Sequence, residues 1–114
     1  MFPTVNPTTT AAWKELEAYF KTFKGTQMKE LFANDTTRFE NYSIKFEDIL
    51  VDFSKNIVDD HVFSLFMKLV RECGLKDAIA SQFTGERINK TENRPVLHTA
   101  LRNRGNKPVF VDGK

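Results

Sequence analysis

The sequence has few of the residues that build disulfide frameworks or metal centres. Its 114 residues include one cysteine, Cys73, and two histidines, His61 and His98. One cysteine excludes an internal disulfide and a multi-cysteine metal site, and it agrees with a reducing compartment. Two isolated histidines do not make a metal site either. We therefore expect no bound metal and a cytoplasmic location.

The sequence also lacks a dominant charge and a long apolar run. The 17 Lys and Arg residues nearly balance 15 Asp and Glu, so the net charge is only +2. A field this weak does not recruit nucleic acid or an anionic membrane to the whole molecule. No stretch is long enough to span a bilayer, and residues 1–7 lack the features of a signal peptide. We expect a soluble chain without a membrane or nucleic-acid partner.

What the sequence does contain is apolar and aromatic. Hydrophobic residues make up 40% and aromatic residues 12%, with eleven Phe. This composition indicates a folded chain rather than a disordered one, and the length fits one domain.

The first third of the sequence predicts two helices. Asn6 can cap a helix with Pro7 at its first position, and Gly25 can end it. The apolar residues between them recur at helical spacing: Trp13, Leu16, Phe20 and Phe23. A shorter helix is expected from Thr26 to about Asp35, and we take residues 1–37 as a helical extension.

From Arg38 the apolar period changes to two. Tyr42, Ile44 and Phe46 alternate with polar residues, and residues 49–53 form a nearly continuous apolar run. We expect two strands joined by a hairpin turn near Glu47 and Asp48. The second strand is predicted to be buried on both faces, as a central strand is.

The second half predicts mainly helix. One helix should open at Asp59 or Asp60 and end at Gly74, and another should follow and end at Gly85. Asn89 and Glu92 have the spacing of a capping box, which predicts a third helix. Its inward residues would be Val96, Leu97, Ala100 and Leu101. Residues 109–111 read as a strand that lacks a partner within the sequence.

A basic segment follows Gly85. Its cations are Arg87, Lys90, Arg94, Arg102, Arg104 and Lys107. They could bind an anion near a helix N-terminus, or they could form a solvated, salt-bridged face or dock onto other parts of a longer chain. The segment has no aromatic residues between Gly85 and Pro108, which argues against nucleic acid.

The possible acid/base residues favour structural roles. His98 would share a helix with Arg94 and Arg102, four residues from each, but no nucleophile or metal ligand accompanies it. His61 lies at a predicted helix start. The carboxylates of Glu47, Asp48 and Asp52 are close in sequence, but solvation or capping explains a turn and strand position better than catalysis does.

Four parts of the sequence together resemble the N-terminal part of glucose-6-phosphate isomerases. Residues 85–104 read GERINKTENRPVLHTALRNR, the longest part of the resemblance, in which Pro95 stands where we expect alanine. Residues 50–56, LVDFSKN, resemble the first buried strand of that family and its following turn. The opening helix, with Asn6, Pro7 and Trp13, and the closing VFVDGK of residues 109–114 are also similar.

The resemblance implies an enzyme several times longer than this chain. Such an isomerase is a homodimer of αβα-sandwich (SIS-type) domains that interconverts glucose 6-phosphate and fructose 6-phosphate, in glycolysis and gluconeogenesis, without a cofactor. A glutamate moves a proton through an enediol intermediate, and a Ser/Thr-rich loop holds the phosphate. These elements follow the region that residues 85–114 resemble. The resemblance therefore places no catalytic, cofactor-binding or metal residue in this chain.

We accordingly expect an inactive N-terminal fragment, with residues 38–114 forming the incomplete start of an αβα domain. It would be mostly helical, with a hairpin and an orphaned C-terminal strand, and it could self-associate. The alternative from the residues themselves is a small basic-faced module that binds an anion or a protein.

Overall fold

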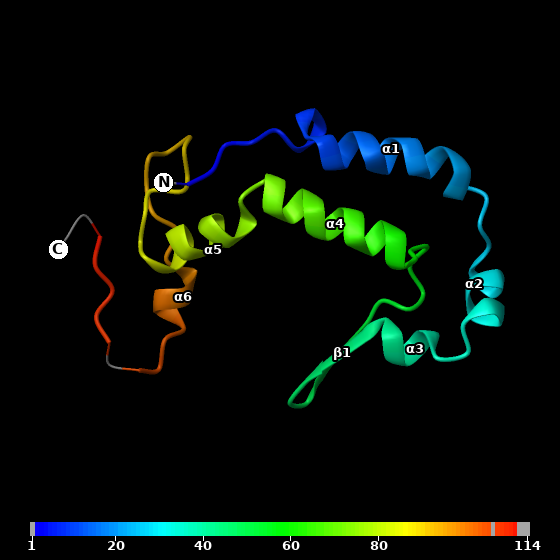
Figure 1. Cartoon of the computed structure of the whole chain (residues 1–114). Helices are drawn as coiled ribbons and strands as arrows, with labels where there is room; N and C mark the ends of the chain where they lie inside the picture. The colour runs from blue at the N-terminus through cyan, green and yellow to red at the C-terminus, as the bar shows by residue number, and fades with distance from the viewer. Residues whose placement is uncertain (1, 106, 112–114) are drawn as a thin grey trace.

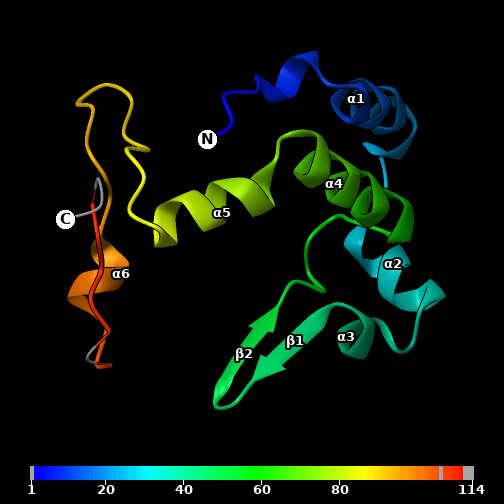
Figure 2. The same ribbon diagram turned by 60° about the vertical axis from the view of Figure 1, so that its left-hand side comes forward.

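The computed structural model describes residues 2–105 and 107–111 as an open arrangement of helices with one hairpin. The elements are η1 (Pro7–Thr9), α1 (Ala11–Phe23), α2 (Met28–Asn34), α3 (Arg38–Asn41), β1 (Ser43–Phe46), β2 (Ile49–Asp52), α4 (Asp60–Glu72), α5 (Leu75–Phe83) and α6 (His98–Leu101). Figures 1 and 2 both show α1 and α4 side by side, with the hairpin below α4 and α6 on the left-hand side.

The molecule is more extended than a compact domain of its length. Its radius of gyration is 18.7 Å and its principal extents are 56 × 38 × 18 Å. A compact domain of this size would have a radius of gyration of about 13 Å. The buried apolar residues of the described chain are correspondingly few: Ala12, Tyr42, Val62 and Leu65.

The N-terminal helix starts later than the sequence predicts. Asn6 does act as a cap, but for the short η1, where its side chain accepts a hydrogen bond from the Thr8 amide at 3.1 Å. Thr10 is extended, and its hydroxyl oxygen then accepts from the Trp13 amide at 3.2 Å as the cap of α1. The prediction of one helix capped by Asn6 is therefore wrong, because a second cap residue interrupts it. The helix ends at Phe23, just before Gly25 as expected.

The helix α4 has the predicted bounds. The Asp59 carboxylate caps it by accepting from the Val62 amide at 2.8 Å, and Gly74 ends it with a left-handed φ of 66°. Two side-chain contacts tie α4 to α1: Glu72 accepts from the Ala12 amide at 3.0 Å, and Lys68 pairs with Glu15 at 2.5 Å. Ala12 of α1 and Val62 and Leu65 of α4 make up most of the small core.

The predicted hairpin is present, but its second strand is not buried. Ser43 pairs with Asp52 and Phe46 with Ile49, and Glu47 in the turn has a φ of 53°. All four residues of β2 are exposed. The prediction of a strand buried on both faces is wrong for this chain, since the sheet has two strands and neither face is covered.

A short helix, α3, precedes the hairpin in a stretch where the sequence analysis predicts no helix. The Asp35 carboxylate accepts from the Thr37 amide at 3.0 Å and from its hydroxyl at 2.9 Å. These bonds close a local turn and set the chain into α3 at Arg38. Asp35 was expected only as the end of the preceding helix.

The predicted capping box after Gly85 closes a loop rather than starting a helix. One bond of the predicted capping box forms, because the Asn89 side-chain oxygen accepts from the Glu92 amide at 3.1 Å. The Glu92 carboxylate accepts at 3.0 Å from the side-chain amide of Asn89, not from its backbone N–H. However, Asn89 and Arg94 also exchange two backbone hydrogen bonds, and Asn93 has a φ of 50°. The chain turns back on itself, and the helix that follows is only the four-residue α6. Leu101, predicted to point inward, is 86% exposed.

The predicted terminal strand is also absent from the described residues. Residues 107–111 have no regular structure, and the rest of the closing motif, residues 112–114, lies outside the described residues. This segment nevertheless passes close to Gly85. A Cβ atom there would lie 2.6 Å from the Phe110 carbonyl oxygen, and φ at Gly85 is 76°. Glycine is therefore required at this position both by conformation and by space.

Candidate functional site

The most organised polar cluster surrounds a buried arginine that the sequence analysis did not single out. Arg38 is 2% exposed and lies in α3. Its Nε donates to the Ser54 carbonyl oxygen at 2.8 Å, and its Nη2 donates to those of Asn56 and Val58 at 3.0 and 2.8 Å. The guanidinium also lies over the ring of Tyr42, 4.4 Å from its centroid. The side chain thus fixes the loop between β2 and α4.

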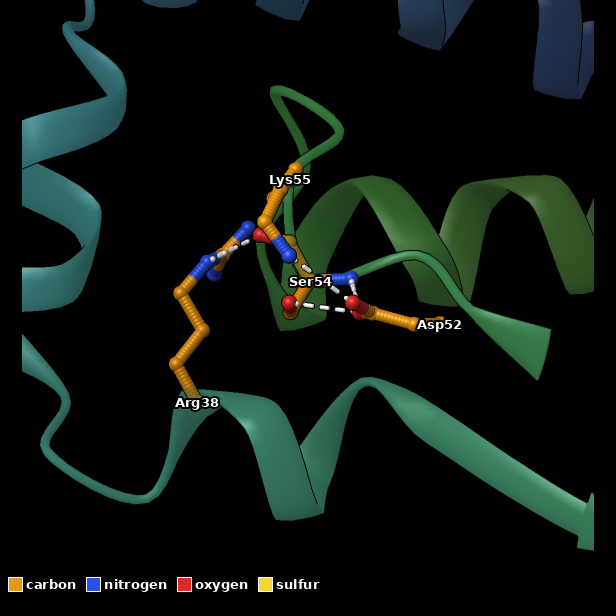
Figure 3. Close-up of polar contacts among 4 residues, drawn as sticks. All are labelled: Arg38, Asp52, Ser54 and Lys55. Atoms are coloured by element: carbon orange, nitrogen blue, oxygen red, sulfur yellow. Dashed lines mark hydrogen bonds and ion pairs between the residues drawn. The ribbon is translucent and has the colours of Figure 1, made fainter. Parts of the chain in front are cut away.

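The same loop is held from its other end by Asp52 (Figure 3). One carboxylate oxygen accepts from the Ser54 amide at 2.9 Å and from the Ser54 hydroxyl at 2.6 Å, and the other pairs with Lys55 at 2.9 Å. The Ser54 hydroxyl and the Lys55 ammonium group lower the pKa of Asp52 to about 2. Asp52 therefore caps this turn, as the sequence predicts for it.

Two tyrosines bind the carboxylates that open α4. The Tyr19 hydroxyl donates to Asp59 at 2.7 Å, and the Tyr42 hydroxyl donates to Asp60 at 2.5 Å. The hydrogen bond to Asp59 raises the pKa of Tyr19. Burial, together with the bond to Asp60, raises the pKa of Tyr42 to about 12. Both phenols therefore remain neutral donors near pH 7, and Asp59 and Asp60 are hydrogen-bonded rather than free to act as bases.

These groups border a hollow of about 290 Å³. Three of the residues that line it carry carboxylates: Asp35, Asp59 and Asp60. The other lining residues are Leu31, Asn34, Arg38, Tyr42 and His61. The cation in this lining, Arg38, already binds three carbonyl oxygens. Because the carboxylates would repel a phosphate and no other Lys or Arg lines the hollow, it is unsuited to a sugar phosphate.

The two histidines lie in different elements, His61 in α4 and His98 in α6. His61, in the first turn of α4, has its ring edge-on to that of Tyr19, with the centroids 4.5 Å apart. His98 is exposed at the start of α6. Arg94 precedes that helix and Arg102 ends it, so the prediction that one helix carries all three residues is wrong.

The basic segment is engaged in local contacts. Arg87 donates to the Asn93 carbonyl oxygen at 2.7 Å, and Arg94 pairs with Glu92 at 2.6 Å. The Lys90 ammonium group lies 6.0 Å from the centroid of the Phe2 ring. A four-residue helix such as α6 also provides little dipole for an anion. These contacts favour the salt-bridged interpretation of the segment over an anion site.

Two further observations concern metals and membranes. Among residues 2–105 and 107–111, no three Cys, His, Asp or Glu side chains are grouped so that they could hold a metal ion. Within the same ranges, no helix has the length and apolar character that a bilayer crossing requires. Cys73 is half-buried at the end of α4, as its place on the inward stripe predicts.

The residues that hold the loop and the start of α4 differ in how easily they can be identified from the sequence. Asp52, Asp59 and Asp60 stand at predicted turn or helix-start positions, where a carboxylate is expected to act as a cap. Arg38 and the tyrosines give no such signal, because their partners are 16 to 40 positions away. The spacing of Arg38 and Tyr42, four residues apart, is the one local indication.

Comparisons with known proteins agree with the resemblance in sequence. The family model described as Phosphoglucose isomerase matches residues 52–114. A protein of Christiangramia forsetii named Glucose-6-phosphate isomerase is 52% identical over 110 residues, which cover 96% of this chain. The chain spans only 20% of the length of that relative. The match begins at Asp52, the residue that caps the turn in Figure 3. This chain belongs to the phosphoglucose isomerase family.

Proposed function

We propose that this chain is the N-terminal part of an isomerase that interconverts glucose 6-phosphate and fructose 6-phosphate. The observation that carries the proposal is the 52% identity to the Christiangramia forsetii relative over almost the whole chain. The family model supports it independently over residues 52–114. The chemistry would be proton transfer between adjacent sugar carbons through an enediol, which needs an acid/base group beside a phosphate site.

We propose further that these 114 residues supply scaffold rather than chemistry. Asp52, Asp59 and Asp60 are bound to a serine, a lysine and two tyrosines, and the buried Arg38 is bound to backbone carbonyl oxygens. None of these groups has the freedom of a general base or a phosphate-binding cation. The catalytic residues would then come from the four fifths of the relative's length that this chain does not span.

The proposed organisation is a helical extension, residues 1–37, followed by the start of an αβα-sandwich domain, residues 38–114. The hairpin followed by α4 supports a strand-to-helix beginning. The extension would not be independent, because α1 packs on α4 from the second part. In the complete protein we propose a cytoplasmic homodimer that acts on the sugar phosphate without a cofactor.

The test compares two proteins. One is the 114-residue chain, and the other is a chimera in which this chain replaces the matching 110 residues of the Christiangramia forsetii relative. Fructose 6-phosphate is supplied and the product is coupled to a dehydrogenase. We expect turnover from the chimera and none above the blank from the chain alone. A chimera that folds as the relative does yet lacks turnover would refute the isomerase proposal, and turnover by the repurified chain would refute the scaffold proposal.

A further inference from the structure

One face of the hairpin is apolar and uncovered. In the observed register Ile44 lies opposite Val51, and Phe46 lies opposite Ile49. Because cross-strand partners share a face and residues two apart along a strand do too, all four side chains lie on one face. Their exposed fractions are 59% for Ile44, 55% for Val51, 68% for Phe46 and 58% for Ile49. We call these four residues the hairpin face.

The opposite face of the same hairpin has a different composition. It carries Ser43, Lys45, Leu50 and Asp52, three of them polar or charged. A two-stranded ribbon with one apolar and one polar side is the pattern of a sheet that is covered on one side only. An isolated two-stranded hairpin is marginal in water at best, and a covering layer is what stabilises such ribbons. The hairpin face therefore has the composition of an internal surface.

The hairpin is tied to the rest of the molecule at its base, not along this face. Phe53 follows β2 and stacks on Phe63 of α4, with the ring centroids 5.8 Å apart and the planes at 11°. Tyr42 precedes β1 and meets the Phe53 ring edge-on at 5.9 Å. These contacts fix the point where the hairpin leaves the body. In Figure 2 the hairpin points away from α4.

Similar uncovered surface occurs on other elements. Leu75, Ile79 and Phe83 recur every four residues along α5 and are exposed. In α1, Phe20 is exposed as well. A second copy of this chain bound through one self-complementary patch would cover only one of these surfaces. A polypeptide four times longer could cover all of them.

We propose that the hairpin face is the docking surface for the part of an isomerase-length polypeptide that lies beyond this chain. The occupant is an apolar surface of that polypeptide. The relative's length argues for it, since this chain matches a fifth of the relative, and so does the extended shape of the molecule. This inference rests on the proposed function, from which the test below separates it.

The test measures cysteine labelling at two positions on opposite faces of β1 and β2. Ile49→Cys lies on the hairpin face and Lys45→Cys on the other face, and both parent residues are exposed in this chain. Each is placed in the 114-residue chain and in the chimera described above. A maleimide is added and peptide mapping by mass spectrometry gives the labelling rate at each cysteine. The same two cysteines, at the aligned positions of the unaltered relative, repeat the measurement if the chimera does not fold.

We expect the cysteine of Ile49→Cys to be labelled at least about tenfold more slowly in the chimera than in the chain, as a buried thiol is. The cysteine of Lys45→Cys should react at similar rates in both. Equal labelling of Ile49→Cys in the two proteins would overturn the docking proposal, even if the chimera turns over substrate. Slow labelling in an inactive chimera would keep the docking proposal and reject the proposed activity. Protection that depends on concentration in the 114-residue chain would show a second copy to be the occupant, and so overturn the proposal as well.

Discussion

The hairpin and the loop that follows it are adjacent in sequence but opposite in how completely their interactions are satisfied. In the loop, Arg38 and Asp52 together bind backbone and side-chain groups of residues 54–58. Among the described residues, no buried side-chain nitrogen or oxygen lacks a hydrogen-bond partner. In the hairpin, by contrast, the four apolar side chains of one face are each more than half exposed.

The difference shows which interactions a short chain can complete by itself. A hydrogen bond needs one partner, which can be two residues away, as Ser54 is from Asp52. Burial of an apolar face needs a second layer of structure, which must come from distant sequence. The interactions of the polar loop are therefore complete within the described residues, while the apolar face of the hairpin is left exposed.

The largest expected effect comes from a substitution that breaks the hydrogen bonds of the loop. Arg38→Ala would remove the guanidinium donor from three carbonyl oxygens, of which that of Asn56 keeps the Val58 amide, and would remove a buried side chain that contacts Tyr42. We expect the free energy of unfolding of the chain to fall by about 3 kcal/mol or more, as for other broken buried charge networks. Urea unfolding followed by circular dichroism measures it. Arg104→Ala, at an exposed position, is the matched control and should change the free energy by no more than about 0.5 kcal/mol. If the two variants were equally stable, the arginine would not organise the loop.

A smaller effect should appear as a dependence of stability on pH. The pKa of Asp52 is lowered from 3.8 to about 2 in the folded chain, first by the Ser54 hydroxyl and then by Lys55. A lowered pKa means that the folded state prefers the carboxylate. The contribution is therefore present above the unfolded value and is lost as the pH falls through the folded one. We expect the urea midpoint to decline between about pH 4 and pH 2.

The Asp52→Asn variant identifies the group responsible. It cannot titrate, so its urea midpoint should vary less over that interval than that of the parent chain. Asp48→Asn, in the exposed hairpin turn, should keep the parent's dependence. Parallel pH profiles for the parent and Asp52→Asn would mean that other carboxylates cause the decline.

The same contrast between near and distant partners explains what could be predicted from the sequence. The caps at Asp59 and Asp52, the hairpin turn at Glu47 and the helix end at Gly74 depend on residues within a few positions, and all four are found. The family itself could be recognised from residues 85–104. The bounds of α4 follow from such local signals too.

Two wrong predictions, for β2 and for residues 109–111, depended on whether further structure covers those segments. The β2 run looks like a central strand, and residues 109–111 also read as a strand, because both are strongly apolar. Among the described residues β2 pairs only with β1 and residues 109–111 form no strand, so β2 is exposed and residues 109–111 are irregular. At Asn89 half of the local signal was real, since its side-chain oxygen accepts from the Glu92 amide. The backbone bridge between Asn89 and Arg94 nevertheless determines the conformation of this segment. A spacing of five residues is not a sequence signal for such a bridge. Arg38 was missed because its three acceptors are 16 to 20 positions away.

The smallest expected effect comes from a substitution on the exposed hairpin face. In Phe46→Ser the removed ring is 68% exposed, so little burial is lost on folding. We expect the free energy of unfolding of the 114-residue chain to change by no more than about 0.5 kcal/mol. Leu65→Ala is the contrasting variant, because Leu65 is 5% exposed in the small core and its truncation should cost about 2 kcal/mol or more. The same pair in the chimera should become more alike, since Phe46 would then be covered. A loss from Phe46→Ser in the chain as large as that from Leu65→Ala would show that the ring is already buried, and the contrast between the two regions would not hold.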